Sequence, residues 1–222
     1  MKNIYIIIIA IVLLVTVNEL SAQTIIDTGS VTNNRVYLSA GIYPATMLSF
    51  GYEHKFDISF LKRPVSVFAE VGVSITNFKG SELRFGGILP VFEKRNFKII
   101  NTLNVSAGIL STKNFDSKRS AIADEVAIGF YREASFIAIT AGYKKIYLNK
   151  IEHTDYYRET YHEDAVDSNK GTGGIFMFGL IGGITIEKKY DILLVLKLPF
   201  TEKFNSYDSS PVHLNLMIGY SL

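Results

Sequence analysis

An all-β fold, an up-and-down antiparallel β-barrel of about ten strands, is predicted by three observations on this 222-residue sequence. Apolar residues alternate with small or polar ones along most of the chain. The 17 glycines and the 13% of aromatic residues, all Tyr and Phe, favour β structure over helix. In the second half of the chain, tight polar turns alternate with long polar loops. One substantial domain fits this length.

The first 22 residues have the three parts of a secretory signal peptide. Lys2 precedes an apolar run of 14 residues from Ile4 to Val17, and Ala22 is a small residue before a cleavage point. The run is shorter than the roughly 20 residues that a membrane-spanning helix needs. We therefore expect cleavage after Ala22 and export from the cytoplasm, then a short N-terminal segment at residues 23–34 and a barrel domain at residues 35–222.

Ten stretches show the period-two pattern of β-strands. Between Val65 and Ile75, for example, apolar residues take the odd positions. The ten stretches are residues 35–43, 47–57, 65–75, 82–92, 97–109, 121–131, 135–148, 173–187, 191–200 and 212–222. Eight strands remain the alternative if two weak ones merge or fray. After the signal peptide, no segment shows a convincing helical period.

The predicted connections differ in length according to the end of the barrel on which they lie. Tight turns at residues 93–96, 132–134 and 188–190 alternate with loops at residues 111–120, 149–172 and 201–211. An even number of strands puts both chain ends on the side of the tight turns. Short turns at one end and long loops at the other are typical of a transmembrane β-barrel.

The composition of the two strand faces distinguishes a membrane barrel from a soluble one. One face is almost entirely Leu, Ile, Val, Phe and Tyr, as lipid contact requires, with Asn101 as an exception. The other face is mainly Gly, Ser, Thr, Ala and Asn, whereas a face in water would be rich in Lys and Glu. The apolar face is therefore expected against lipid and the polar face around a narrow lumen. A secreted soluble barrel or sandwich is the alternative.

A few charged residues of both signs fall on the polar face and form the candidate site. Buried charges need partners, and Glu70 and Arg84 lie on adjacent predicted strands where they can pair. Such charges either lock the barrel as a structural plug or line a path for small ions. The interiors of barrels of about eight to ten strands are largely filled by side chains, which favours the plug. The candidate lumen charge network comprises Glu53, Glu70, Arg84, Glu125 and Lys197.

Other chemistry has little support in the sequence. The absence of cysteine excludes disulfides and thiolate metal sites, and a net charge of +2 with scattered Lys and Arg argues against a nucleic-acid partner. The loop at residues 149–172 contains six carboxylates, several Tyr, His153 and His162, but no fixed ligand spacing. We expect no metal and no cofactor there, and we interpret the loop as a solvated segment whose tyrosines offer a contact surface for an extracellular partner.

The last stretch, PVHLNLMIGYSL, alternates large apolar residues with polar or small ones up to the final residue. It resembles the assembly signal of small bacterial outer-membrane β-barrel proteins, which has an aromatic residue third from the end and an apolar last residue. Leu222 stands where a Phe is usual. The alternating residues are Leu214, Leu216, Ile218, Tyr220 and Leu222. The resemblance covers residues 35–222 and implies an outer-membrane location, lipid contact and recognition by the barrel-assembly machinery.

Three functions follow from these expectations. The first is a structural or interaction role carried by the extracellular loops. The second is a narrow channel for small solutes. The third, a loop-borne hydrolase, has the least support because no Gly-x-Ser-x-Gly motif is present and only four histidines are available, so enzymatic activity is not expected.

Overall fold

A computed structural model gives the fold for residues 33–42, 46–58, 63–75, 80–111, 115–161, 171–201 and 212–222. The predicted signal peptide and much of the predicted loop sequence lie outside these ranges. The ten strands are β1 (Asn34–Ile42), β2 (Thr46–Ile58), β3 (Arg63–Ser74), β4 (Ser81–Lys94), β5 (Phe97–Ser111), β6 (Phe115–Tyr131), β7 (Ser135–His153), β8 (Gly171–Ile186), β9 (Tyr190–Thr201) and β10 (His213–Ser221).

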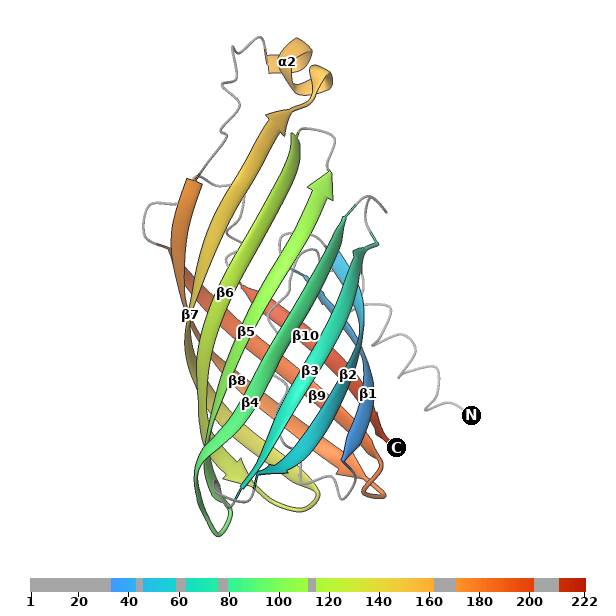
Figure 1. The fold of residues 1–222 in the computed structure, drawn as a ribbon, viewed down its shortest axis with the longest axis vertical. Coiled ribbons are helices and arrows are strands. Elements are labelled where there is room, and N and C mark those ends of the chain that lie inside the picture. Colours follow the sequence, from blue (N-terminus) through green and yellow to red (C-terminus); the bar gives the residue numbers. More distant parts are fainter. Residues whose placement is uncertain are drawn as a thin grey trace, which may run out of the picture.

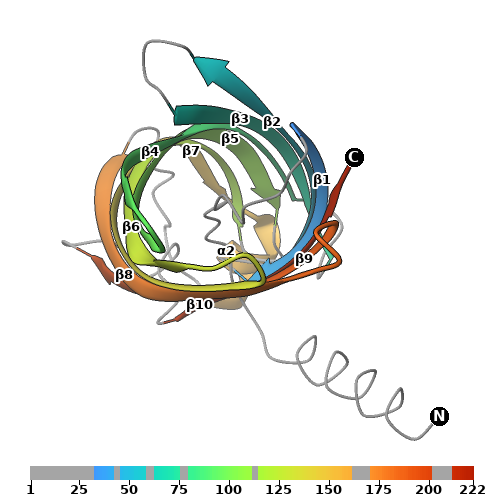
Figure 2. The same cartoon turned by 90° about the horizontal axis from the view of Figure 1, so that it is seen from below.

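The strands form one closed antiparallel barrel in chain order (Figures 1 and 2). Each strand pairs with its neighbours in sequence, and β10 pairs with β1 from Arg35 opposite Ser221 to Gly41 opposite Asn215. The last strand therefore closes the sheet, and no edge between β1 and β10 is left open. The predicted ten-stranded antiparallel barrel is confirmed, and the eight-stranded alternative is wrong.

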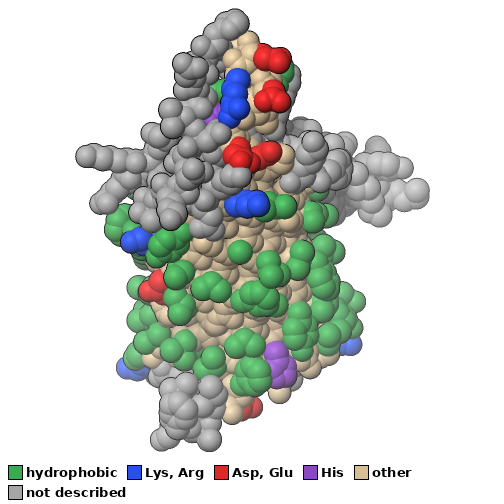
Figure 3. Space-filling model, turned by 45° about the horizontal axis from the view of Figure 1, so that its top comes forward, with side chains coloured by type: hydrophobic (Ala, Val, Ile, Leu, Met, Phe, Trp, Pro, Cys, Tyr) green, Lys and Arg blue, Asp and Glu red, His purple; other side chains and the backbone are tan. Residues whose placement is uncertain are grey.

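Side chains alternate between the inside and the outside of the barrel as the period-two pattern predicts. On the outside, Leu103 and Val71 are 53% and 52% exposed, whereas the intervening positions of the same strands, such as Thr102 and Glu70, are buried. Large apolar side chains cover the outer wall (Figure 3). We call this surface the apolar belt.

Aromatic pairs mark both edges of the apolar belt. At the end with the tight turns, which we call the turn end, the ring pairs are Phe92–Phe97, Phe97–Phe130 and Tyr190–Tyr220, with centroids 6.1, 5.6 and 5.2 Å apart. Towards the other end, the loop end, they are Tyr143–Phe176 and Phe178–Phe200, at 4.8 and 5.8 Å. Two aromatic girdles around an apolar band are the pattern of barrels that cross a membrane.

Strands β5, β6 and β7 rise above the rest of the barrel at the loop end (Figure 1). The predicted loop at residues 111–120 is wrong, because β5 and β6 stay paired as far as Ser111 opposite Asp116. Sequence alternation could not reveal this extension, since polar side chains occupy both faces of the ladder there while the backbone hydrogen bonds continue. We call this part of the barrel the β5–β7 projection.

A short helix, α2 (Asp155–Tyr161), follows β7. The backbone N–H of Tyr157 bonds the side-chain oxygen of Thr154, 3.4 Å away, and Asp155 lies in the first turn, where a negative charge is favourable. The expectation of no helix here was wrong, because seven residues are too few to show a helical period. Within the predicted loop at residues 149–172, the structure therefore has strand to His153, helix over Asp155–Tyr161 and strand again from Gly171. No helix in the described ranges is long and apolar enough to cross a membrane.

Candidate functional site

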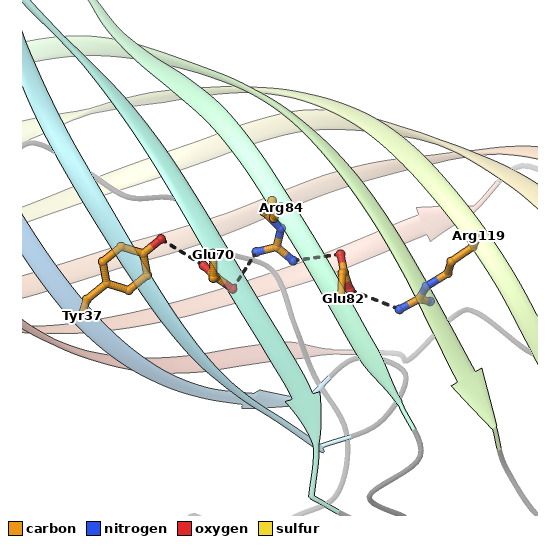
Figure 4. A network of polar contacts seen from close by, with 5 residues as sticks. All are labelled: Tyr37, Glu70, Glu82, Arg84 and Arg119. Carbon is orange, nitrogen blue, oxygen red and sulfur yellow. Dashed lines mark hydrogen bonds and ion pairs between the residues drawn. The ribbon is translucent and has the colours of Figure 1, made fainter.

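The largest group of polar contacts in the lumen runs along one wall from β1 to β6 (Figure 4). The Tyr37 hydroxyl donates to Glu70 Oε2 at 3.1 Å, and Glu70 Oε1 lies 3.6 Å from Arg84 Nη1. Arg84 Nη2 contacts Glu82 Oε1 at 3.3 Å, and Arg119 Nη2 contacts Glu82 Oε2 at 3.4 Å. We call these five residues the wall chain. Its charges alternate in sign, so each carboxylate has a cationic neighbour.

Glycines allow the wall chain to pass over intervening strands. Tyr37 on β1 and Glu70 on β3 both face Gly51 on β2, and a Cβ atom there would lie 2.0 Å from the Tyr37 ring. In the same way, Gly108 on β5 lies between Glu82 on β4 and Arg119 on β6. A glycine between two polar partners therefore lets side chains two strands apart meet above the sheet.

A second group lies near the turn end. Arg35 on β1 contacts Glu53 Oε2 on β2 through Nη1 at 3.5 Å, and Asp191 Oδ2 on β9 through Nε at 3.1 Å. The Thr185 hydroxyl donates to Asp191 Oδ1 at 2.7 Å. The Arg35 guanidinium crosses β10 above Gly219, where a Cβ atom would lie 2.5 Å from Nε. This group, the closure cluster, ties β1 to β9 across β10 and so spans the closing seam.

A third contact crosses the lumen. Lys197 on β9 forms an ion pair with Glu125 on β6, and their side chains are 1% and 6% exposed. Strands β7 and β8 lie between these two in the barrel order. We call this ion pair the lumen bridge. Gly179 faces Lys197 and Gly142 faces Glu125 on the intervening strands, which again leaves room for long side chains.

Apolar side chains fill the lumen on both sides of the lumen bridge. Towards the turn end, a buried cluster includes stacked Tyr131 and Phe136, whose centroids are 5.1 Å apart. Other members of this cluster are Phe68, Ile88, Ile100, Ile181, Leu193, Val195 and Met217. Towards the loop end, a second cluster comprises Ile42, Ala121, Ile146, Ile175 and Met177, with Leu214 packed against it. Such a stacked, interdigitated interior is the arrangement expected of a closed barrel.

The structure places the five predicted lumen residues in all three groups. Glu70 and Arg84 belong to the wall chain, Glu53 to the closure cluster, and Glu125 and Lys197 form the lumen bridge. Within the five, Glu70 contacts Arg84 and Glu125 contacts Lys197, whereas Glu53 contacts Arg35. All five are buried.

Sequence reasoning missed four charged partners: Arg35, Glu82, Asp191 and Arg119. Three of them stand at or next to the first residue of a strand, and Arg119 lies in the segment predicted as a loop. Glu82 could have been found, because it lies two residues before Arg84 and shares its face. The other partners depend on the strand register, which the sequence does not display.

The loop end contains charged residues but no assembled metal site within the described ranges. No group of three or more His, Asp or Glu there lies close enough to hold a metal ion. The His153 ring packs against Tyr157, with centroids 4.8 Å apart, and His162 lies outside the described residues. At the tip of the β5–β7 projection, a hollow of about 220 Å³ is lined by Ile109, Leu110, Ser111, Asp116, Ser117, Lys118 and Glu152.

No protein-family model and no curated protein matches the chain. Among solved structures, 33 chains match. The N-terminal β-barrel domain of Pseudomonas aeruginosa OprF is 8% identical over 85% of this chain and 97% of that chain, with a TM-score of 0.42. BamA from Haemophilus ducreyi lacking POTRA domains 1–3 is 13% identical over 81% of this chain and 43% of that chain, with a TM-score of 0.39. The chain thus spans less than half of that BamA chain. A likeness at this level assigns neither partner nor activity to this chain.

Proposed function

We propose that the chain is an outer-membrane β-barrel with a closed lumen, and that its loop end has a structural or contact role outside the cell. The observation that carries this proposal is the apolar belt. Side chains such as Phe130, Ile137 and Ile139 are 60%, 61% and 59% exposed on the outer wall. Soluble monomers rarely expose apolar patches larger than a few hundred Å². A bilayer accounts for a belt that surrounds the whole barrel.

The packed lumen favours a structural role over a narrow channel. A solute crossing the barrel would meet the turn-end apolar cluster, the lumen bridge and the loop-end cluster in succession. Separating the lumen bridge would also break the ion pair between two buried charges, at a cost of several kcal/mol. The closed state therefore has a large energetic advantage.

The loop end supports the contact role. The β5–β7 projection presents polar side chains, and α2 presents Tyr156, which is 43% exposed. A rigid paired ladder holds this surface away from the apolar belt, so that a partner could approach without touching lipid. A solvent-exposed tyrosine offers a large contact area at low entropic cost.

Assembly in the outer membrane is the second part of the proposal. The outward side chains of β10 and the chain end include Ile218, Tyr220 and Leu222, which are 51%, 37% and 57% exposed. They are the apolar row that resembles the assembly signal, and in the folded barrel they contribute to the apolar belt. Recognition of this row by the barrel-assembly machinery and export by a cleaved signal peptide belong to the same proposal.

A matched pair of cysteine variants tests the orientation, because the natural chain contains no cysteine. Glu159→Cys on α2 should react with a membrane-impermeant maleimide on intact cells. Glu133→Cys, exposed in the turn between β6 and β7, should react only after the outer membrane is permeabilised. Equal labelling of the two on intact cells would contradict the proposed orientation.

Three further measurements test embedding and closure. The folded protein should remain in the membrane fraction after an alkaline wash and should migrate differently on a gel before and after heating. In planar bilayers it should show no stable conductance. A water-soluble monomer would refute the membrane proposal, whereas a stable conductance would refute the closed lumen alone.

A further inference from the structure

A polar pair interrupts the apolar belt on the outer face of β5 and β6. Asn101 Nδ2 donates to Asp124 Oδ1 at 2.6 Å and lies 3.5 Å from the Glu125 carbonyl oxygen. Asp124 is exposed, and its neighbours in register are Leu103 on β5 and Tyr143 on β7. Both polar side chains therefore stand on the side of the sheet that faces away from the lumen.

The pair is flanked by apolar side chains along both of its strands, and Tyr143 of the loop-end aromatic pairs lies beside Asp124. Along β5, outward side chains on the turn-end side of Asn101 are Phe97 and Ile99, and those on the loop-end side are Leu103, Val105, Ala107 and Ile109. Along β6, Phe130, Ile128 and Val126 lie on one side of Asp124 and Ile122 on the other. Along its own strands the pair therefore interrupts a continuous row of outward apolar side chains.

A carboxylate in this position is costly against lipid. An ionisable side chain facing acyl chains lacks hydrogen-bond partners, and such residues usually mark a functional contact. Asn101 supplies one donor to one oxygen of Asp124, and no described residue forms an ion pair with Asp124. Lys145 lies on the same outer face, one register step towards the loop end, opposite Ile122. Its ammonium group lies 5.8 Å from the Tyr147 ring and likewise has no carboxylate partner among the described residues.

We propose that the outer face of β5–β7 is a two-fold interface between two copies of this chain within the membrane, with the Asn101–Asp124 pair at its centre. This inference rests on the proposed membrane embedding. A two-fold axis brings the same patch of both copies together, so the patch must be self-complementary. This one carries the amide of Asn101, the carboxylate of Asp124 and the ammonium group of Lys145, which supply donors and acceptors to one another across the axis. Acyl chains supply no donor.

Small residues beside the pair permit close approach. Ala141 on β7 and Asn101 on β5 both face Val126 on β6, and Gly87 on β4 faces Leu103. A Cβ atom at Gly87 would have its nearest neighbour at 3.7 Å, so packing within the barrel does not require glycine there. Short side chains at Gly87 and Ala141 therefore lie next to Leu103 and Tyr143, and they let the outer wall of a second barrel approach closely there.

Thiol cross-linking in membranes tests this interface. Ala141→Cys should give a cross-linked dimer with a short bismaleimide, whereas Leu38→Cys, on the outer face of β1 and 53% exposed, should give none. Adding Asn101→Leu and Asp124→Leu to the Ala141→Cys chain should lower the yield roughly tenfold, the effect expected when polar contacts between membrane segments are lost. Heat-modifiable migration verifies that every variant is folded.

Four outcomes would contradict the proposed interface. Absence of the Ala141→Cys dimer, an equal yield from Leu38→Cys, an unchanged yield after the two leucine substitutions, or a cross-link to a protein of different mass would each contradict self-association. The alkaline wash on the same membranes separates the two proposals. A wash-resistant barrel without cross-link refutes only the dimer, whereas a barrel released by the wash refutes the membrane embedding.

Discussion

Removing one partner of the lumen bridge should destabilise the barrel strongly. In Lys197→Met, the Glu125 carboxylate stays buried without its cation, a change that typically costs about 3–5 kcal/mol. Thr102 lies directly opposite Glu125, and its buried hydroxyl has no partner among the described residues, so it can turn towards the carboxylate. We therefore expect a loss of about 3 kcal/mol in the free energy of unfolding, at the lower end of that range.

The measurement is equilibrium unfolding by urea in lipid vesicles, followed by circular dichroism because the chain has no tryptophan. Lys98→Met is the matched control. Lys98 pairs at 3.1 Å with Glu93; the Lys98 side chain is 13% exposed and Met fills its space, while the Glu93 side chain is 40% exposed and stays solvated, so this substitution should cost about 0–1 kcal/mol.

The double variant Glu125→Gln/Lys197→Met removes both charges and tests the cause. It should regain most of the stability lost in Lys197→Met, because a buried pair replaced as a whole is often nearly neutral. Two outcomes would show that the lumen bridge is not a stabilising buried ion pair. One is a cost of Lys197→Met no larger than that of Lys98→Met, and the other is a double variant less stable than Lys197→Met alone.

Three further substitutions can be compared by the same unfolding measurement. Val71→Arg, which places a charge in the apolar belt between Phe50 and Leu83, should cost about 2–4 kcal/mol while Val71→Leu costs almost nothing; equal stability would mean that this face does not meet lipid. Gly86→Ala puts a Cβ atom 2.4 Å from a buried phenyl ring and 2.7 Å from a backbone oxygen, so it should cost about 1–3 kcal/mol. Gly87→Ala, on the outer face, should be nearly neutral, and equal costs for the two would contradict the assigned faces. Tyr37→Phe removes a hydrogen bond to a buried carboxylate and should cost about 1.5–3 kcal/mol. Tyr52→Phe removes an exposed hydrogen bond and should cost less than about 1 kcal/mol, so a larger loss from Tyr52→Phe would contradict the role of the wall chain.

The barrel could be predicted from the sequence because a period of two is unambiguous when it recurs ten times. Each strand repeats the same division into an apolar face and a face of small or polar residues, so errors in single strands do not change the architecture. The pattern failed where the outward side chains stop being apolar. Between Phe115 and Ser120 both faces of β6 are polar or small, and the ladder there was invisible to it.

The lumen contacts were only partly predictable, because they depend on register between strands. Alternation places Glu70 and Arg84 on the inner face, but it does not show that Gly51 allows Tyr37 to reach Glu70 across β2. Nor does it show that Lys197 reaches Glu125 across two strands. A glycine at a lumen position is therefore informative only once its neighbours on both sides are known.

Two adjacent acidic residues show that the strand register determines which face of the wall a side chain takes. Asp124 and Glu125 have similar chemistry, but Asp124 is on the outer face beside Asn101 and Glu125 is on the inner face beside Lys197. A slip of β6 by one residue would exchange their faces, which would separate the lumen bridge and also move Ile122 and Ile128 into the lumen. Glu125 therefore opposes this misalignment, because the slip would move its carboxylate from the lumen to the outer wall. Asp124 opposes the same slip only if it meets a polar partner outside the barrel, which is the contact that the proposed two-fold interface would provide.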